Sequence, residues 1–165
     1  MTTTTQADAF WQRPPRSRRL RDLEAAYQNG DFSPREATEA LIRRAAALPE
    51  IARTAYIEFK PDRLRQSTPI QYPSGAGPLA GMPVSIKDLF DVAGEVTRAG
   101  SRVLADAAPA AHDAEAVVRL RSSGAQLCGR TTMTEFAFSG LGLNPHYGTP
   151  PNPCLLYTSP SPRDS

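Results

Sequence analysis

The sequence has little of the residues from which metal centres and disulfide frameworks are built. Its 165 residues include two cysteines, Cys128 and Cys154, and two histidines, His112 and His146. Two cysteines give neither a disulfide framework nor a thiolate cluster, and two distant histidines give no metal site. We therefore expect no metal and no cofactor. We interpret Cys128 as a small buried apolar residue with a reduced thiol.

The chain also lacks an excess of charge and a long apolar run. Nineteen basic residues against 17 acidic ones leave a net charge of +2, whereas domains that bind nucleic acid through bulk charge are strongly basic. No apolar run approaches the roughly 20 residues of a membrane span. The amino terminus, MTTTTQADAF, has no apolar core of a secretory signal. The sequence therefore predicts a cytoplasmic protein without a membrane or nucleic-acid partner.

Lysine is scarce among the basic residues. Seventeen are arginines, and the two lysines are Lys60 and Lys87. This bias is typical of a GC-rich genome, and we expect a bacterial source. It also makes each lysine informative, because arginine is not deprotonated in proteins whereas a desolvated lysine is.

Helix signals occur in the first half of the chain and again near its end. Ser33 is a candidate N-cap, Pro34 suits the first helical position, and Glu36 completes a capping box. Apolar spacing and stop signals predict helices over residues 18–28, 34–48 and 113–121. Residues 1–16 are polar and contain two prolines, so we expect a flexible leader there.

Short runs of β-branched and aromatic residues predict three strands, over residues 54–59, 84–87 and 125–129. Residues 60–78 contain several prolines and little apolar content, and we expect them to form a connecting loop. From residue 84 onward the order is strand, helix, strand. This order predicts the α/β fold class.

Residues 77–88, GPLAGMPVSIKD, are the most informative segment. Glycines and prolines define a turn, and a strand then presents Lys87 at its end. A lysine with the ordinary pKa of ~10.4 is neutral in fewer than about one molecule in a thousand at pH 7, and burial increases the neutral share. A neutral amine accepts a proton from a serine in Ser-Lys catalysis. These residues alone leave a second interpretation open, a surface lysine paired with Asp88.

Several segments in combination resemble the amidase signature family, over roughly residues 18–153. They are residues 77–88, Gly94, Ala99–Ser101, Gly129–Ala137 and the run from Asn144 to Pro153. The family hydrolyses amides, or transfers the ammonia released, with a Ser-Ser-Lys triad. One serine is the nucleophile, a second in a cis peptide bridges to it, and the lysine is the base. The resemblance implies an α/β/α fold with a mixed sheet flanked by helices.

The resemblance also assigns roles to residues of this chain. Lys87 matches the catalytic lysine, and Ala137 and Ser139 fall where the wall of the substrate channel is expected. The implied partner of the complete protein is a small amide substrate. The residues that build most of the channel lie elsewhere in the family, so the sequence does not define which amide it is.

After Asn152–Pro153 the chain departs from the family pattern. The family continues into a Gly- and Ser-rich segment whose bridging serine would fall near position 163, where this chain has Arg163. Residues 154–165 lack glycine and periodicity and resemble a non-native tail, so Ser159 and Ser161 are not assigned as catalytic. We expect residues 17–153 to be the amino-terminal portion of an amidase domain, inactive alone because both serines are absent.

Three alternatives stay open at this point. The parent protein is a free-standing amidase, or the amidotransferase subunit that supplies ammonia to a misacylated tRNA. Otherwise the chain is a truncated, non-catalytic module that binds a partner through its helices. The reading frame downstream of codon 153 separates the first two alternatives from the third, because a continuing Gly-Gly-Ser-Ser-Gly segment indicates the amidase signature class and a true stop favours the module.

Overall fold

A computed structural model describes residues 4–73 and 77–151. The chain divides into two compact units, and each unit is made of segments that are separated in the sequence. Unit 1 contains Met1–Leu48, Lys60–Val84 and Leu120–Cys128, and unit 2 contains Pro49–Phe59, Ser85–Arg119 and Gly129–Ser165. The fold of each unit determines which of the sequence motifs lie next to one another in space.

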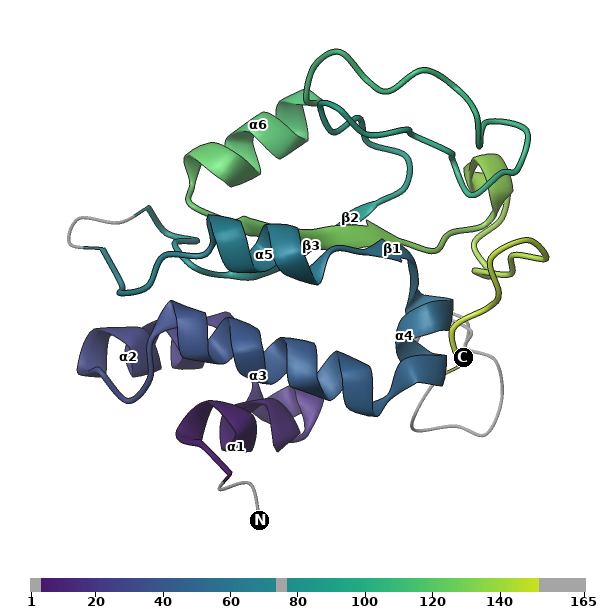
Figure 1. The fold of residues 1–165 in the computed structure, drawn as a ribbon. Helices are drawn as coiled ribbons and strands as arrows, with labels where there is room; N and C mark the ends of the chain where they lie inside the picture. The colour runs from purple at the N-terminus through teal and green to yellow at the C-terminus, as the bar shows by residue number, and fades with distance from the viewer. Residues whose placement is uncertain (1–3, 74–76, 152–165) are drawn as a thin grey trace. The chain divides into compact units, whose positions relative to one another are not determined.

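Unit 1 is mainly helical. Its helices are α1 (Gln6–Gln12), α2 (Leu20–Asn29), α3 (Pro34–Ala47) and α5 (Pro61–Ser67), with a short 3₁₀ turn, η1, at Pro15–Ser17. Figure 1 shows α1 running alongside α3, and the two helices are in contact. Apolar residues spaced for helix faces form one core: Ala7, Phe10, Leu23, Ala26, Tyr27, Phe32, Ala37, Ala40 and Met82.

Helix α3 begins as the sequence predicts. The Ser33 hydroxyl accepts a hydrogen bond from the Glu36 N–H at 3.2 Å, and a Glu36 carboxylate oxygen accepts one from the Ser33 N–H at 2.7 Å. These two bonds satisfy donors that a helix start otherwise leaves without partners. Helix α2 ends at Gly30, which adopts the left-handed conformation. Both stop and start signals are therefore confirmed.

The structure differs from the flexible leader expected over residues 1–16. Thr5 and Asp8 form a capping box, and helix α1 follows at Gln6–Gln12. Phe10 is 2% exposed, and the Trp11 indole N–H donates to the Ala37 carbonyl oxygen at 2.8 Å. The helix was not predicted because the threonines that precede it are polar and only seven residues are helical. Residues 1–3 lie outside the described part.

A second difference lies in the loop expected over residues 60–78. Residues Pro61–Ser67 form helix α5, in which Pro61 occupies the first turn. Leu64 is completely buried, and Arg65 lies 3.0 Å from a carboxylate oxygen of Glu39 on α3. Tertiary contacts therefore stabilise a seven-residue helix that composition alone did not predict.

Three strands form one sheet in the order β1-β3-β2: β1 (Tyr56–Phe59), β2 (Pro83–Lys87) and β3 (Gln126–Thr131). Strand β1 pairs with β3 in antiparallel orientation, with Tyr56 opposite Thr131 and Phe59 opposite Gly129. Helix α6 (Glu115–Ser122) connects β2 to β3, and α4 (Pro49–Ala55) precedes β1. The α/β fold class is therefore confirmed.

The predicted start of the last helix needs a small correction. Helix α6 begins at Glu115, and the Asp113 carboxylate accepts a hydrogen bond from the Ala93 N–H at 2.7 Å. Asp113 thus connects the start of this helix region to the loop after β2.

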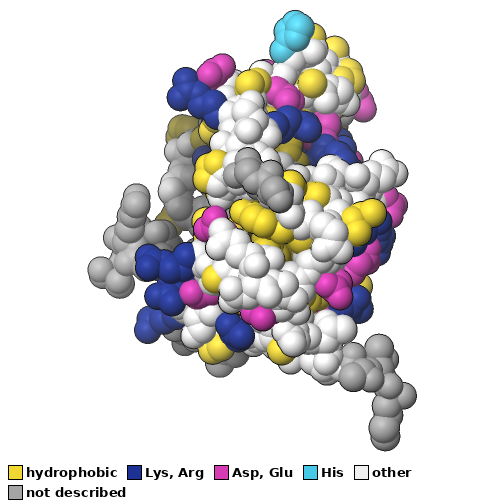
Figure 2. Space-filling view, turned by 90° about the vertical axis from the view of Figure 1, so that its left-hand side faces the viewer, with side chains coloured by type: hydrophobic (Ala, Val, Ile, Leu, Met, Phe, Trp, Pro, Cys, Tyr) yellow, Lys and Arg dark blue, Asp and Glu magenta, His cyan; other side chains and the backbone are white. Residues whose placement is uncertain are grey.

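The surface carries charges of both signs. Figure 2 shows Lys and Arg side chains interspersed with Asp and Glu side chains on the face that it presents, which agrees with the small net charge. None of the helices in residues 4–73 and 77–151 has the length and apolarity that a membrane span requires.

Candidate active site

Lys87 is the last residue of β2 and lies in unit 2. Its neighbours Ile86 and Asp88 are buried whereas Lys87 is exposed, because successive side chains of a strand point to opposite sides. The Lys87 carbonyl oxygen accepts a hydrogen bond from the Phe90 N–H at 3.1 Å, which turns the chain after the strand. Within the described residues, Lys87 forms no ion pair.

The second interpretation is correct in part: Lys87 is exposed and Asp88 forms a salt bridge, but its partner is Arg130 and not Lys87. One carboxylate oxygen of Asp88 accepts a hydrogen bond from the Arg130 Nε at 2.6 Å, and the other accepts one from the Gly100 N–H at 3.0 Å. The Asp88 and Arg130 side chains are both 0% exposed. The carboxylate next to the candidate base is therefore committed to a different cation.

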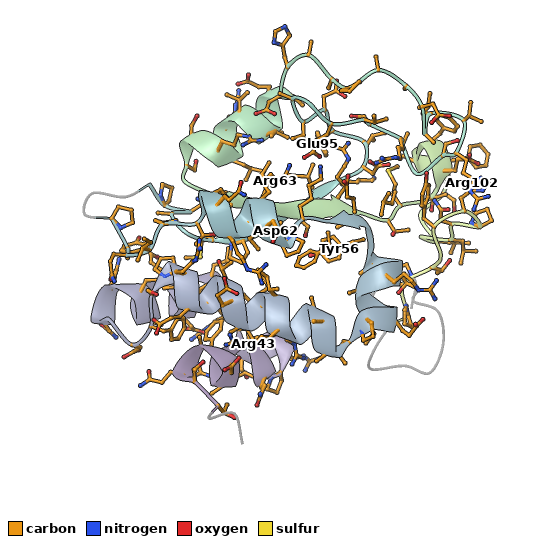
Figure 3. All side chains as sticks on the ribbon, in the orientation of Figure 1. Arg43, Tyr56, Asp62, Arg63, Glu95 and Arg102 are labelled. Atoms are coloured by element: carbon orange, nitrogen blue, oxygen red, sulfur yellow. The ribbon has the colours of Figure 1, made fainter. Side chains whose placement is uncertain are left out.

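Arg130 lies on β3 and uses its whole guanidinium group. Beyond Asp88, one terminal nitrogen donates to a Glu95 carboxylate oxygen at 3.3 Å. The other terminal nitrogen donates to the Phe90 carbonyl oxygen at 2.8 Å and to the Thr97 hydroxyl at 3.1 Å. Glu95, labelled in Figure 3, is itself part of the loop that follows β2. A buried charge is tolerated when it is paired and hydrogen-bonded in this way.

This buried cluster is not among the features that the sequence predicted. The signal was an arginine inside an otherwise apolar strand, because the burial of β3 is continuous from Leu127 to Arg130. A charged residue at a fully buried strand position requires a partner of opposite charge. The partners Asp88 and Glu95 lie 42 and 35 residues earlier, and their pairing was not predictable from local spacing.

The Ala99–Ser101 loop is held against Asp88 by its backbone. The Ala99 N–H donates to the Asp88 carbonyl oxygen at 2.9 Å, and Gly100 has a φ of 68°. A Cβ at Gly100 would lie 2.8 Å from the Met133 carbonyl oxygen. Only glycine combines this left-handed conformation with so close an approach.

Asn144 joins three of the segments that carry the family resemblance. Its side-chain nitrogen donates to the Gly100 carbonyl oxygen at 2.8 Å and to the Met133 carbonyl oxygen at 2.6 Å. Its side-chain oxygen accepts hydrogen bonds from the backbone N–H groups of His146 and Tyr147. The motif segments are therefore adjacent in unit 2 although they are distant in the sequence.

Ser101, Glu135 and His146 form a second polar cluster in unit 2. The buried Ser101 hydroxyl donates to a Glu135 carboxylate oxygen at 2.5 Å, and the His146 Nε2 lies 3.3 Å from that same oxygen. The serine proton is directed at the carboxylate and not at the imidazole, so this is not the arrangement of a Ser-His-acid triad. Within the described residues, no group of three metal-ligating side chains is arranged to hold a metal ion.

Ala137 and Ser139 lie on an exposed segment of unit 2. Ala137 and its neighbour Phe136 have φ values of 56° and 52° in the 3₁₀ turn η2 (Glu135–Ala137). The Ser139 hydroxyl accepts a hydrogen bond from the Leu141 N–H at 3.2 Å. In the described part of the chain, no hydrogen bond joins either residue to Lys87.

Beside this segment lies an open cavity of about 390 Å³, lined by Thr134, Glu135, Phe136, Phe138, Leu143 and Pro145. Neither Ala137 nor Ser139 lines it.

Cys128 is buried at 3% exposure, as predicted. The expected non-native tail lies outside the described residues. It includes Cys154, Ser159, Ser161 and Arg163.

Comparison with known proteins identifies the class to which this fold and these motifs belong. Residues 36–160, which are 125 of the 165 residues, match the family model described as Amidase. The chain belongs to the amidase family.

Particular relatives share this assignment. The chain is 35% identical over 143 residues to a glutamyl-tRNA(Gln) amidotransferase subunit of Alkalilimnicola ehrlichii, which covers 84% of this chain and 29% of that protein. It is 46% identical over 76 residues to AtzE, a 1-carboxybiuret hydrolase subunit of Pseudomonas sp. (strain ADP), covering 46% of this chain and 17% of that protein.

A solved structure shows the same fold. A chain from a vestigial protein complex, studied for the evolutionary origins of an s-triazine catabolic enzyme, superposes with a TM-score of 0.75 at 31% identity. That match covers 82% of this chain and 31% of the solved chain. This chain therefore spans less than a third of the length of each of these relatives.

Proposed function

We propose that this chain is part of a protein that hydrolyses the carbon–nitrogen bond of a small amide, with Lys87 as the general base. The observation that carries the proposal is the position of Lys87 at the end of β2, beside an acid that is committed to Arg130. Lys87 is exposed in this chain, so in this proposal the burial that favours a neutral amine is supplied by the remainder of the parent protein. An amine without an acidic partner in the described residues is suited to accept a proton, because an adjacent carboxylate would favour its charged form.

The proposed reaction needs two serines in addition to the lysine. The Lys87 amine accepts a proton that reaches it from the nucleophilic serine through the bridging serine, and the serine oxygen then forms a bond to the amide carbonyl carbon. The carbon–nitrogen bond breaks as the leaving nitrogen takes up the proton that Lys87 accepted. Water then hydrolyses the ester formed on the serine, which releases the carboxylic acid and restores the serine hydroxyl. The family positions of these serines are not matched by serines in this chain, so we propose that the 165-residue chain alone is inactive.

The segment around Ala137 and Ser139 is proposed to contact the substrate. Its support is the adjacent cavity with Phe136, Phe138 and Leu143 in the lining, since ligand sites are concave and mostly apolar with a few polar groups. The left-handed conformations of Phe136 and Ala137 add support, because such backbone strain clusters at ligand-binding sites.

A second function has specific support. The similarity to the glutamyl-tRNA(Gln) amidotransferase protein extends over 84% of this chain, compared with 46% for the 1-carboxybiuret hydrolase protein. We therefore keep a protein that supplies ammonia for the amidation of a misacylated tRNA as the alternative. Stimulation of ammonia release from glutamine by that tRNA would favour this alternative over a free-standing amidase.

The proposal is tested in the protein encoded by the complete reading frame that contains residues 1–153. Lys87→Ala should abolish amide hydrolysis and leave the far-UV circular dichroism spectrum and the Tm nearly unchanged. Lys87→Arg should be almost as inactive, because arginine stays protonated. Lys60→Arg is the matched control and should retain activity. Substantial activity of Lys87→Arg, or a true stop directly after codon 153, would contradict the proposal.

A further inference from the structure

We infer that Asp88 and Arg130 are a positioning pair for Lys87: the arginine holds the neighbouring carboxylate on the buried side of β2 and neutralises its charge, so that the Lys87 amine remains without an acidic partner. The importance of this pair for catalysis rests on the proposed function of Lys87. The electrostatic effect itself does not, and it is measurable in the chain as it stands.

The geometry of the pair fixes the carboxylate in one place. Both oxygens of Asp88 are occupied, one by the Arg130 Nε at 2.6 Å and the other by the Gly100 N–H at 3.0 Å. Its carbonyl oxygen also accepts a hydrogen bond, from the Ala99 N–H at 2.9 Å. Three contacts from two segments therefore prevent Asp88 from turning toward Lys87.

Arg130 is in turn fixed from several directions. It contacts Glu95, the Phe90 carbonyl oxygen and the Thr97 hydroxyl in addition to Asp88. Such a planar fork with several partners is a geometry that lysine does not reproduce. The pair thus connects β3, on which Arg130 lies, to the first ten residues of the loop that begins directly after Lys87.

The charge of Asp88 is close enough to matter. Asp88 follows Lys87 directly, and neighbouring Cα atoms are ~3.8 Å apart. The two side chains point to opposite sides of the strand, so the charge of Asp88 acts on the amine over more than the contact distance of an ion pair and its effect is modest. In the wild-type protein the positive charge of Arg130 offsets that of Asp88. Glu95 shares Arg130 with Asp88, so removal of Arg130 leaves two carboxylates without their cation, whereas removal of Asp88 leaves Arg130 paired with Glu95. The net charge of the cluster changes by one unit in opposite directions.

The other charged groups of this region also have partners, and Glu95 shares Arg130 with Asp88. In residues 89–101 and the segments hydrogen-bonded to them, Asp91 accepts a hydrogen bond from Thr97, Glu95 contacts Arg130, Arg98 pairs with Glu58, and Glu135 contacts Ser101 and His146. Asp88 is therefore the carboxylate whose release would act most directly on Lys87.

Competitive labelling of amines tests the inference, because only the neutral amine reacts with an electrophile. The 165-residue chain is labelled with trace amounts of acetic anhydride across a range of pH, and the labelled peptides are quantified by mass spectrometry. The chain has only two lysines, so Lys60 serves as an internal reference. The measured quantity is the pH at which Lys87 reaches half of its maximal labelling rate.

The expected shifts have opposite signs for the two partners. Arg130→Met removes a positive charge and should raise the half-labelling pH of Lys87 by a few tenths of a pH unit, because the amine is exposed and screened by solvent. Asp88→Asn removes a negative charge and should lower it by a similar amount. The double variant Asp88→Asn/Arg130→Met should return it close to the wild-type value. Lys60 should not change in any variant.

Two results would overturn the inference. One is an unchanged half-labelling pH of Lys87 in all variants, and the other is a shift of the same sign in both single variants, which indicates general loosening of the site. If a single variant does not fold, as judged by circular dichroism, the other single variant and the double variant decide. The proposed function is tested separately, by the amidase activity of Lys87→Ala in the complete protein. If that variant is fully active while the labelling shifts have opposite signs, the electrostatic inference stands and only the proposed function is rejected.

Discussion

The phenol of Tyr27 on α2 donates a hydrogen bond to the carbonyl oxygen of Gly81, which lies 54 residues further along the chain, at a distance of 3.2 Å. Gly81 has a φ of 70°, and a Cβ on it would lie 2.7 Å from the Cβ of Pro34 at the start of α3. In unit 1, two helices and the turn before β2 therefore meet at one glycine.

Gly81→Ala should destabilise the protein by about 2–4 kcal/mol, because it adds the strain of a left-handed alanine and a steric overlap with Pro34. Gly94→Ala is the matched control, since Gly94 has a φ of 79° but no atom within 4 Å of the added Cβ. Urea unfolding at low temperature measures both. Equal losses for the two variants would show that the contact with Pro34 has no effect.

The Tyr27 phenol predicts a loss of stability at alkaline pH. Burial, with a further contribution from Tyr72, raises the pKa of the Tyr27 phenol above its ordinary value. The unfolded chain releases this proton near pH ~10, whereas the folded chain keeps it. The contribution is therefore present below pH ~10 and lost as the pH rises further.

Tyr27→Phe should cost about 1 kcal/mol at pH 7 through the lost hydrogen bond, and it should flatten the decline above pH 10. Urea unfolding between pH 7 and pH 11 provides the comparison. The same alkaline decline in the wild type and in Tyr27→Phe would assign the effect to another group.

The capping box of α3 predicts a loss of stability at acidic pH. Hydrogen bonds from the Ser33 N–H and hydroxyl lower the pKa of Glu36. A carboxylate with a lowered pKa stabilises the folded state above its unfolded value of ~4.3, and this contribution disappears as the pH falls through the folded value.

Ser33→Ala should therefore lower the unfolding free energy by about 1 kcal/mol at pH 7 and by less at pH 3. Thermal unfolding followed by circular dichroism at the two pH values tests this. A loss that is larger at pH 3 than at pH 7 would contradict the role of the ionised Glu36.

The sequence predicted the elements that depend on local signals. The Ser33–Glu36 capping box, the stop at Gly30 and the strand ending at Lys87 all follow from residue type and spacing, and the structure confirms them. Helix α5 and the Arg130 cluster depend on contacts across the fold. No local pattern around Arg130 indicates that its partners are Asp88 and Glu95, so this part of the site required the structure.

The exposed apolar side chains of unit 2 predict binding of a hydrophobic dye. Phe138 is 93% exposed, and Phe136, Leu141 and Leu143 are each at least 50% exposed. Monomeric proteins seldom expose apolar groups so close together. Phe138→Ser combined with Leu143→Ser should reduce the fluorescence of the bound dye by roughly half without lowering the Tm.

Val118→Ser is the control for this experiment, since Val118 is also exposed, at 43%, but lies on α6. It should leave dye binding unchanged. If the double variant binds as much dye as the wild type, the dye reports a loosely packed core and not this surface.

The division of the chain into interleaved units affects its synthesis. The chain passes from one unit to the other after residues 48, 59, 84, 119 and 128, so unit 1 is complete only once Cys128 has been translated. At about 5–20 residues per second, the helices of the first 48 residues precede that point by roughly 4–16 s. During this interval the nascent chain presents the apolar faces of α1, α2 and α3 without their full set of packing partners. The order in which the segments of unit 1 follow one another thus sets how long these apolar faces stay uncovered during synthesis.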